Sequence, residues 1–141
     1  MKIANRTIER AAEIASKLEN ASYTGLDNLE KHIADADILV NATSVGMYPK
    51  IDETLVTAEM MHPDLVVFDI VYNPVETRLL REAEKAGVKR RIDGVKMLVF
   101  QGAASFKIWT GISPPLDVME SAVRKALQSA NSKGFSVSGR R

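Results

Sequence analysis

Two short runs of consecutive apolar residues constrain the fold of this chain more than any other feature. They are Ile38–Val40 and Leu65–Phe68. Neither run alternates apolar with polar residues, so each is typical of a strand in a parallel sheet that is covered on both faces. Each run is followed by small and polar residues, and then by a segment that predicts a helix or a helical turn. This alternation predicts an α/β fold whose parallel strands are joined by right-handed crossovers.

The same alternation extends along most of the chain. Shorter strands are predicted at Lys2–Ala4, Ser22–Thr24 and Val88–Ile92. Apolar residues recur at helical spacing within 8–18, 26–33, 79–86, 95–109 and 116–127 and predict helices there. Thr7 is the expected N-cap of the helix at 8–18. Gly87 is expected to end the helix at 79–86. Together these elements predict a parallel sheet with helices on both faces.

Length and composition limit the chain to one soluble domain. Its 141 residues are enough to bury one core, and we expect the domain to span 1–128, with a disordered Ser, Gly and basic tail at 129–141. With 19 basic and 18 acidic residues, the net charge of +1 gives no overall field for nucleic acid or an anionic membrane. The chain has no cysteine and no apolar segment of signal-peptide or membrane-span length, which favours the cytoplasm.

Two arginines in the turn after the first predicted strand form a candidate anion site. Arg6 lies in that turn, and Arg10 follows one helical turn later. Two guanidinium groups beside a helix N-terminus suit phosphate. In a dinucleotide-binding fold the turn after the second strand lies beside the adenosine ribose, where an arginine accommodates the extra phosphate of NADP, and Asn5-Arg6-Thr7 is the candidate for that turn. The alternative is that both arginines are ordinary surface charges, and their spacing alone does not decide between the two.

Polar residues elsewhere give weaker candidates. The segment Asn41–Met47 puts small and hydroxyl residues directly after a buried strand, either to let the backbone approach a flat ligand or as a simple turn. Tyr72 either aims its hydroxyl into a cleft or packs at a strand end. Gln101 lies within the apolar run Met97–Trp109 and, if buried, needs a bound polyol or neighbouring backbone as its partner. Asp69 is expected to be a structural acceptor for nearby backbone amides. No metal-ligand spacing and no Ser/His/Asp arrangement is present.

In order and spacing, these motifs resemble the shikimate dehydrogenase family. The resemblance covers roughly Lys2 to Leu127. It rests on Asn5-Arg6-Thr7, on the segment 41–47, on Asp69-Ile70-Val71-Tyr72-Asn73-Pro74 with Thr77, and on Asp93-Gly94-Val95-Lys96-Met97-Leu98-Val99-Phe100-Gln101-Gly102-Ala103. The last of these, continuing to Gly111, is the most specific to the family. The resemblance implies an oxidoreductase that reduces 3-dehydroshikimate to shikimate with NADPH, a step of chorismate and aromatic amino-acid biosynthesis.

The resemblance also implies roles for individual residues. The clamp on the adenosine 2′-phosphate would consist of Asn5, Arg6, Thr7 and Arg10. The remaining cofactor-binding residues would be Thr43, Ser44 and Val45 along the cofactor, and Ile70, Gly94, Met97 and Leu98 beside the nicotinamide. Shikimate would be contacted by Tyr72 and Gln101.

Several family features have no counterpart in this sequence. Family members carry a separate N-terminal substrate domain, whose lysine and aspartate handle the proton, and a first central strand with a glycine-rich turn for the pyrophosphate. We therefore expect a partial Rossmann-type NADP-binding domain that lacks this strand and loop and contains no catalytic residue. Such a chain should be inactive alone, and poorly stable unless it pairs with another chain, because its sheet would have unpaired interior edges.

Two alternatives stay open at this point. One is a quinate/shikimate dehydrogenase relative with a different substrate or cofactor preference. The other is a non-catalytic nucleotide-binding or interaction module. The sequence does not indicate whether the protein forms a homodimer.

Overall fold

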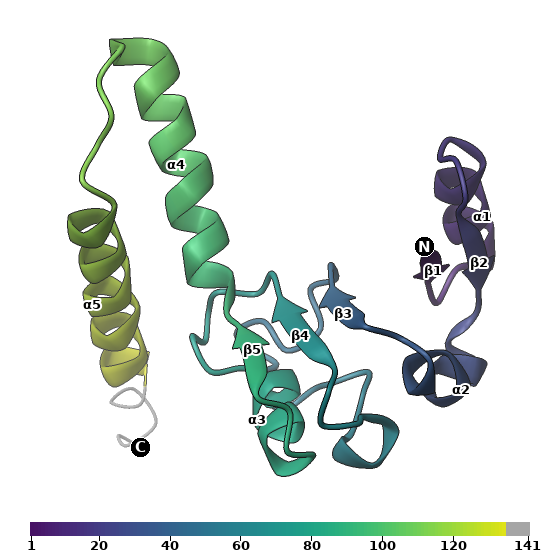
Figure 1. Ribbon diagram of the computed structural model, residues 1–141. Coiled ribbons are helices and arrows are strands. Elements are labelled where there is room, and N and C mark those ends of the chain that lie inside the picture. The colour runs from purple at the N-terminus through teal and green to yellow at the C-terminus, as the bar shows by residue number, and fades with distance from the viewer. Residues whose placement is uncertain (135–141) are drawn as a thin grey trace, which may run out of the picture.

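The computed structural model describes residues 1–134, in which strands and helices alternate along the chain (Figure 1). Among these residues the strands are β1 (Lys2–Ala4), β2 (Ser22–Thr24), β3 (Ile38–Asn41), β4 (Val66–Asp69) and β5 (Arg90–Ile92). The α-helices are α1 (Ile8–Ser16), α2 (Leu29–Ala34), α3 (Arg78–Lys85), α4 (Gly94–Thr110) and α5 (Leu116–Gly134). Two 3-10 turns are η1 (Leu26–Asn28) and η2 (Ala58–Met60). The predicted α/β architecture is confirmed.

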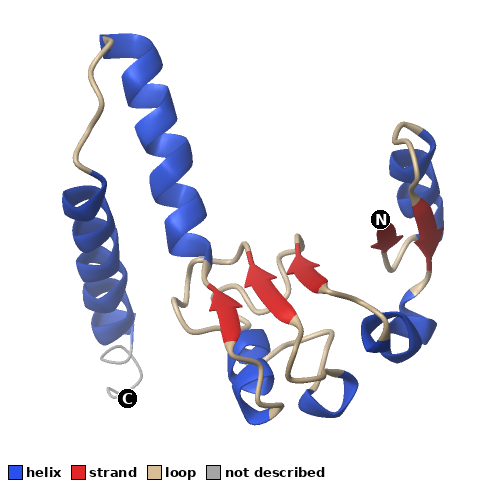
Figure 2. Cartoon of the chain, viewed as in Figure 1, coloured by secondary structure: helices blue, strands red, loops and turns tan. Residues whose placement is uncertain are grey.

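The strands form two parallel sheets, β1-β2 and β3-β4-β5, which Figure 2 shows as two separate groups. In the larger sheet Ile38 pairs with Val66, and Asn41 pairs with Asp69, so β3 and β4 end at the same level. Within the described residues β1 pairs only with β2, and β3 only with β4. In the view of Figure 1, β1 lies between β2 and β3. Within the described residues β1 and β3 are therefore edge strands.

The largest buried cluster lies on one face of β3-β4-β5, where α2, η2 and α3 pack. The helix α3 contributes residues at helical spacing, so one stripe of it faces the sheet. The cluster consists of Ile33, Val56, Met61, Leu65, Val67, Leu79, Leu80, Ala83 and Val88. On β3, Ile38 and Val40 remain 62% and 49% exposed. The continuous apolar run at 38–40 is thus only partly covered by the described residues, although its sequence predicts burial on both faces.

The helices α4 and α5 form a hairpin that extends from the end of β5 (Figure 1). Asp93 caps α4 by accepting from the Val95 N–H at 3.0 Å, and Arg124 of α5 donates to Asp93 Oδ2 at 2.9 Å. Arg124 also lies 2.8 Å from Glu120, and the bonds to Asp93 and then Glu120 raise the pKa of Arg124 above its usual value. At the far end of α4, Gly111 adopts φ +74° and ends the helix.

The first helix, predicted over 8–18, ends at Ser16, and the last, predicted over 116–127, continues to Gly134. Of the two residues predicted to mark helix ends, only one has its expected role. Gly87 has φ +78° and lies just beyond the end of α3, which confirms its predicted role. Thr7 lies at the N-cap position of α1, but its side chain forms no capping bond. Instead, Asn5 Oδ1 accepts from the Thr7 N–H at 2.8 Å, so the turn is closed by the residue two positions earlier.

The C-terminal prediction is only partly covered by the structure. Residues 129–134 belong to α5, where the sequence predicts the start of a disordered tail. The rest of that predicted tail, 135–141, lies outside the described residues. Among the described helices, none combines the length and apolarity that would be needed to cross a membrane.

Candidate functional site

Most of the predicted site residues gather where β3, β4 and β5 end. Thr43, Ser44 and Val45 lie in the loop after β3, and Ile70 and Tyr72 follow β4. The helix α4, which comes directly after β5, contributes Gly94, Met97, Leu98 and Gln101. In open α/β proteins the carboxyl ends of parallel strands form the ligand-binding edge, so the structure brings these three groups to the expected place.

A buried carboxylate joins the first two of these groups. Asp69 is the last residue of β4 and is fully buried. Its Oδ1 accepts from Asn41 Nδ2 at 2.9 Å and from the Val71 N–H at 3.0 Å, while Oδ2 accepts from the Thr77 hydroxyl at 2.6 Å. The prediction that Asp69 is a structural acceptor is confirmed by the bond from Val71. The two side-chain donors were not predicted from the sequence.

Asn41 extends this network into the loop after β3. Its Oδ1 accepts from the Thr43 N–H at 3.1 Å and from the Thr43 hydroxyl at 2.7 Å. Its Nδ2 also donates to the Val45 carbonyl at 3.2 Å, and the Val45 N–H donates to Thr43 Oγ1 at 3.1 Å. The candidate cofactor loop is therefore held in one conformation by the side chain that contacts Asp69.

Thr77 extends the network in the other direction, to the start of α3. It is buried, and its Oγ1 accepts from the Leu80 N–H at 3.3 Å, which caps the helix. A second link between the two loops is the bond from the Tyr48 N–H to the Asn73 carbonyl at 2.9 Å. Among the described side chains, Asn73 Oδ1 is the one buried polar atom without a hydrogen-bond partner.

The third group, which belongs to α4, lies against the loop after β4 because the backbone of that loop comes close to Gly94. A Cβ atom at this position would overlap the carbonyl oxygen of Ile70 and lie 2.7 Å from that of Val71. Both neighbours are backbone atoms, so they cannot rotate away as a flexible side chain would. The first turn of α4 therefore lies directly against the residues that follow β4.

The side chains at this edge differ in their exposure. Ser44, Met97, Tyr72 and Gln101 are exposed, and Thr43, Val45, Ile70 and Leu98 are half-buried. Gln101 Nε2 donates to the Leu98 carbonyl of its own helix at 3.1 Å. The apolar run around Gln101 thus does not bury it within the described chain, and its amide remains accessible.

The candidate anion site lies on the other sheet, after β1. Arg6 and Arg10 are both exposed, and neither forms an ion pair among the described residues. On the same helix, by contrast, Lys17 lies 2.6 Å from Glu13. Asn5 is half-buried and holds the turn through its bond to the exposed Thr7. Both guanidinium groups are therefore accessible to an anion at the N-terminus of α1.

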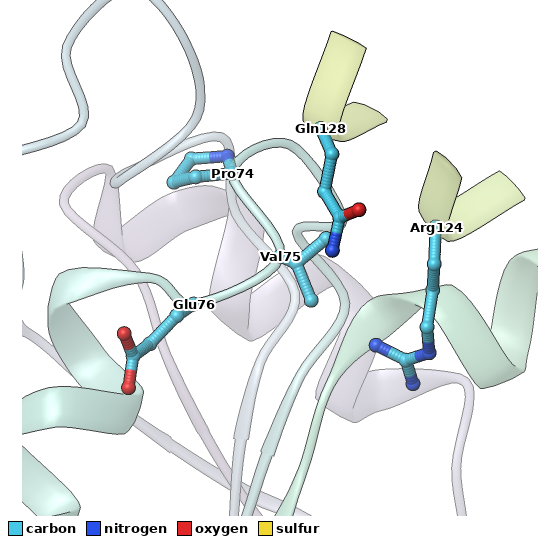
Figure 3. Close-up of a pocket in the computed structure, with 5 residues that line it drawn as sticks. All are labelled: Pro74, Val75, Glu76, Arg124 and Gln128. Atoms are coloured by element: carbon cyan, nitrogen blue, oxygen red, sulfur yellow. The ribbon is translucent and has the colours of Figure 1, made fainter. Parts of the chain in front are cut away.

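A shallow pocket lies between the later part of the loop after β4 and α5 (Figure 3). Its lining residues are Pro74, Val75, Glu76, Arg124 and Gln128. None of them is a predicted site residue, and Arg124 is already bonded to Asp93 and Glu120. No cluster of three or more His, Cys, Asp or Glu side chains in the described part of the chain has the arrangement of a metal site.

Comparisons with known proteins cover nearly the whole described chain. Residues 1–88 match the family described as shikimate / quinate 5-dehydrogenase, and residues 94–124 match the shikimate 5′-dehydrogenase C-terminal domain. The shikimate dehydrogenase (NADP(+)) of Methanosarcina barkeri is 52% identical over 132 residues, which are 89% of this chain and 47% of that protein. The chain thus spans about half the length of the curated relatives it matches.

Two solved structures support the same relationship. A shikimate dehydrogenase in complex with NADP+ gives a TM-score of 0.79 at 45% identity, over 89% of this chain and 46% of that chain. The quinate dehydrogenase from Corynebacterium glutamicum in complex with NAD gives a TM-score of 0.77 at 31% identity, over 85% of this chain and 44% of that chain.

The close approach at Gly94 predicts a large difference between two glycines of the same helix. Gly94→Ala should lower the free energy of unfolding by about 1–3 kcal/mol, because the added methyl group meets backbone. Gly102→Ala is the matched control, since its methyl group would meet only the end of Met119 at 3.5 Å. This control should be neutral, or stabilising by up to about 1 kcal/mol through higher helix propensity. Denaturant unfolding of both variants measures the difference, and equal stabilities would contradict the close approach.

Proposed function

The chain belongs to the shikimate / quinate 5-dehydrogenase family, and we propose that it is the NADP-binding part of an enzyme that reduces 3-dehydroshikimate to shikimate. The observation that carries this proposal is the assembly of the loop after β3, the loop after β4 and the start of α4 at one sheet edge. These are the segments whose motifs resemble the family. Relatives of this chain bear the name shikimate dehydrogenase (NADP(+)), which supports both the reaction and the cofactor.

The cofactor would use both parts of the structure. In this proposal Asn5, Arg6, Thr7 and Arg10 bind the 2′-phosphate, which is supported by the exposed and unpaired state of the two arginines. Thr43, Ser44 and Val45 lie along the cofactor, and the nicotinamide is bordered by Ile70, Gly94, Met97 and Leu98. The missing side chain at Gly94 lets the first turn of α4 lie against the backbone of Ile70 and Val71, which brings Met97 and Leu98 to the same edge as Ile70. When bound, the nicotinamide supplies the hydride.

Substrate contacts would come from Tyr72 and Gln101. Tyr72 is 40% exposed, and Gln101 is exposed with one amide hydrogen directed to its own helix. A phenol and an amide can each donate to and accept from the hydroxyl groups of a polyol. In this proposal both side chains orient the ring and neither transfers a proton.

We propose that the proton donor lies outside this chain, in a substrate domain. Relatives are about twice as long as the segment that matches this chain, so their other half is long enough to form such a domain. Asp69, the acidic residue at the end of β4, is buried and already accepts three hydrogen bonds. The same partner would supply a strand between the free edges of β1 and β3. The proposal requires no homodimer. It includes a cytoplasmic location, and the absence of cysteine from this sequence is compatible with that reducing compartment.

The second candidate is a quinate-specific, NAD-dependent member of the family, and the likeness to the Corynebacterium glutamicum enzyme favours it. In dinucleotide-binding folds an acidic residue in the turn at Arg6 would favour NAD, whereas arginine there favours NADP. Arg6 and Arg10 therefore support the first candidate.

Activity should depend on joining this chain to a substrate domain. We define the reconstituted enzyme as the Methanosarcina barkeri relative in which this chain replaces the 132 matching residues. With 3-dehydroshikimate and NADPH it should turn over at roughly 1 to 1000 per second, followed by absorbance. The 141-residue chain alone should show no turnover. Turnover by that chain alone would place the catalytic residues within it, and a folded but inactive reconstituted enzyme, with either substrate and either cofactor, would favour a non-catalytic module.

Cofactor preference should depend on Arg6. In the reconstituted enzyme, Arg6→Ala should weaken NADPH binding by roughly tenfold to a hundredfold, which corresponds to about 1.5–3 kcal/mol for hydrogen bonds to a charged group. NADH binding should change little, because NADH lacks the 2′-phosphate. Lys17→Ala, an exposed cation farther along the same helix, is the matched control and should affect neither cofactor. An equal loss for NADPH and NADH would exclude the clamp.

Substrate affinity should depend on Gln101 without a change in cofactor affinity. Gln101→Ala in the reconstituted enzyme should lower kcat/KM for shikimate by about twofold to tenfold, the effect of one neutral hydrogen bond. The dissociation constant of NADP+, titrated by fluorescence, should stay the same. Lys107→Ala provides an exposed control on the same helix. If NADP+ affinity fell together with kcat/KM, Gln101 would face the cofactor or support the helix instead.

A further inference from the structure

We propose that Asp69 is a positioning residue for hydride transfer, because its carboxylate fixes the loop after β3, the loop after β4 and the start of α4 relative to one another. This inference rests on the proposed function of those three segments. Asp69 itself touches neither cofactor nor substrate in this proposal, since it is fully buried and all its bonds go to the protein.

The network acts beyond the ends of the strands. The ladder between β3 and β4 already aligns Asn41 with Asp69, and the Ile70 N–H donates to the Asn41 carbonyl at 3.1 Å. The strands therefore need no further fastening at this level. The side-chain bonds of Asp69 instead reach residues that no strand holds, namely Val71 and Thr77 on its own loop and, through Asn41, Thr43 and Val45.

Both ends of the loop that carries Tyr72 are attached to the same carboxylate. Oδ1 holds the Val71 N–H, directly before Tyr72, and Oδ2 holds Thr77 at the start of α3. The close approach of Gly94 then fixes α4 against the backbone of Ile70 and Val71. The proposed nicotinamide and substrate contacts at the edge of β3-β4-β5 are thus positioned from one buried group.

This arrangement matters for hydride transfer because the reaction needs donor and acceptor carbons at a defined distance and angle. Small displacements of the groups that hold the reactants lower the rate steeply, while the affinity for each reactant alone can change little. A loss of the Asp69 network should therefore lower kcat more than it raises KM. A purely structural role would lower stability and leave the kcat of the folded enzyme unchanged.

The test exchanges the two side chains that meet at 2.9 Å. In the reconstituted enzyme, Asn41→Asp places two carboxylates against each other and removes the donor, and kcat for 3-dehydroshikimate should fall at least about tenfold, with a smaller change in KM. Adding Asp69→Asn restores a donor and an acceptor at this contact and should recover kcat several-fold. Recovery is expected to be partial for two reasons. The introduced amide has a single oxygen to accept from both the Val71 N–H and the Thr77 hydroxyl, and Asn41→Asp also loses the bond to the Val45 carbonyl.

The matched control is Val88→Ala, which opens the buried core far from these loops and lowers stability without touching the network. Assays are made below the melting temperature of every variant. Hydrogen exchange of segments 41–46 and 70–77 should rise in Asn41→Asp, fall again in the exchange variant, and stay unchanged in Val88→Ala. If Asn41→Asp fails to fold, Thr77→Val removes the third donor at nearly constant shape, and Thr77→Ser should retain kcat.

The possible outcomes separate this inference from the proposed function. No turnover by the unsubstituted reconstituted enzyme contradicts the proposed function itself. Turnover by that enzyme, together with an unchanged kcat in Asn41→Asp or in Thr77→Val, overturns the positioning role alone. A loss of kcat that the exchange of residues 41 and 69 does not recover at all also overturns it, because the contact between the two side chains would then not be the cause.

Discussion

The carboxylate of Asp69 is the interaction on which the functional edge of this protein depends. A buried charge is costly unless hydrogen bonds replace the water it has lost, so the donors of Asp69 cannot separate from it without a large loss of stability. Those donors come from the end of β3, from the loop after β4 and from the first residue before α3. Three segments that are distant in sequence are thereby bound to one point. The backbone contact at Gly94 adds α4 to the same point.

Patterns within single elements were readable from the sequence, and contacts between elements were not. The apolar runs identified β3 and β4, and Gly87 marked the end of α3, because strand burial and a left-handed helix end each depend on local residue types. The Asn41–Asp69 bond depends on the register of two strands and has no local signal. The continuity of α4 through Gly102 also has no local signal, because glycine disfavours the interior of a helix.

The two parts of the candidate site differ in how firmly the described chain holds them. The edge of β3-β4-β5 is fastened by side-chain bonds and by a packed core, whereas the arginine turn lies on the two-stranded sheet with α1. The chain between these sheets consists of η1 and α2 with their flanking residues. No strand pairing joins β1 to β3 within the described residues. A dinucleotide that contacted both the arginine turn and the edge of β3-β4-β5 would thus bridge the two sheets. A strand paired between β1 and β3 would fix the distance between them.

The hairpin of α4 and α5 ends in a set of exposed apolar side chains, which are Phe106, Ile108, Trp109, Ile112, Leu116 and Val118. Trp109 is 81% exposed and is the single tryptophan of the chain. Its indole is therefore a built-in fluorophore for one location only, with no second tryptophan to blur the signal. In the isolated chain, an emission spectrum with and without iodide would report whether water or another surface surrounds the hairpin tip.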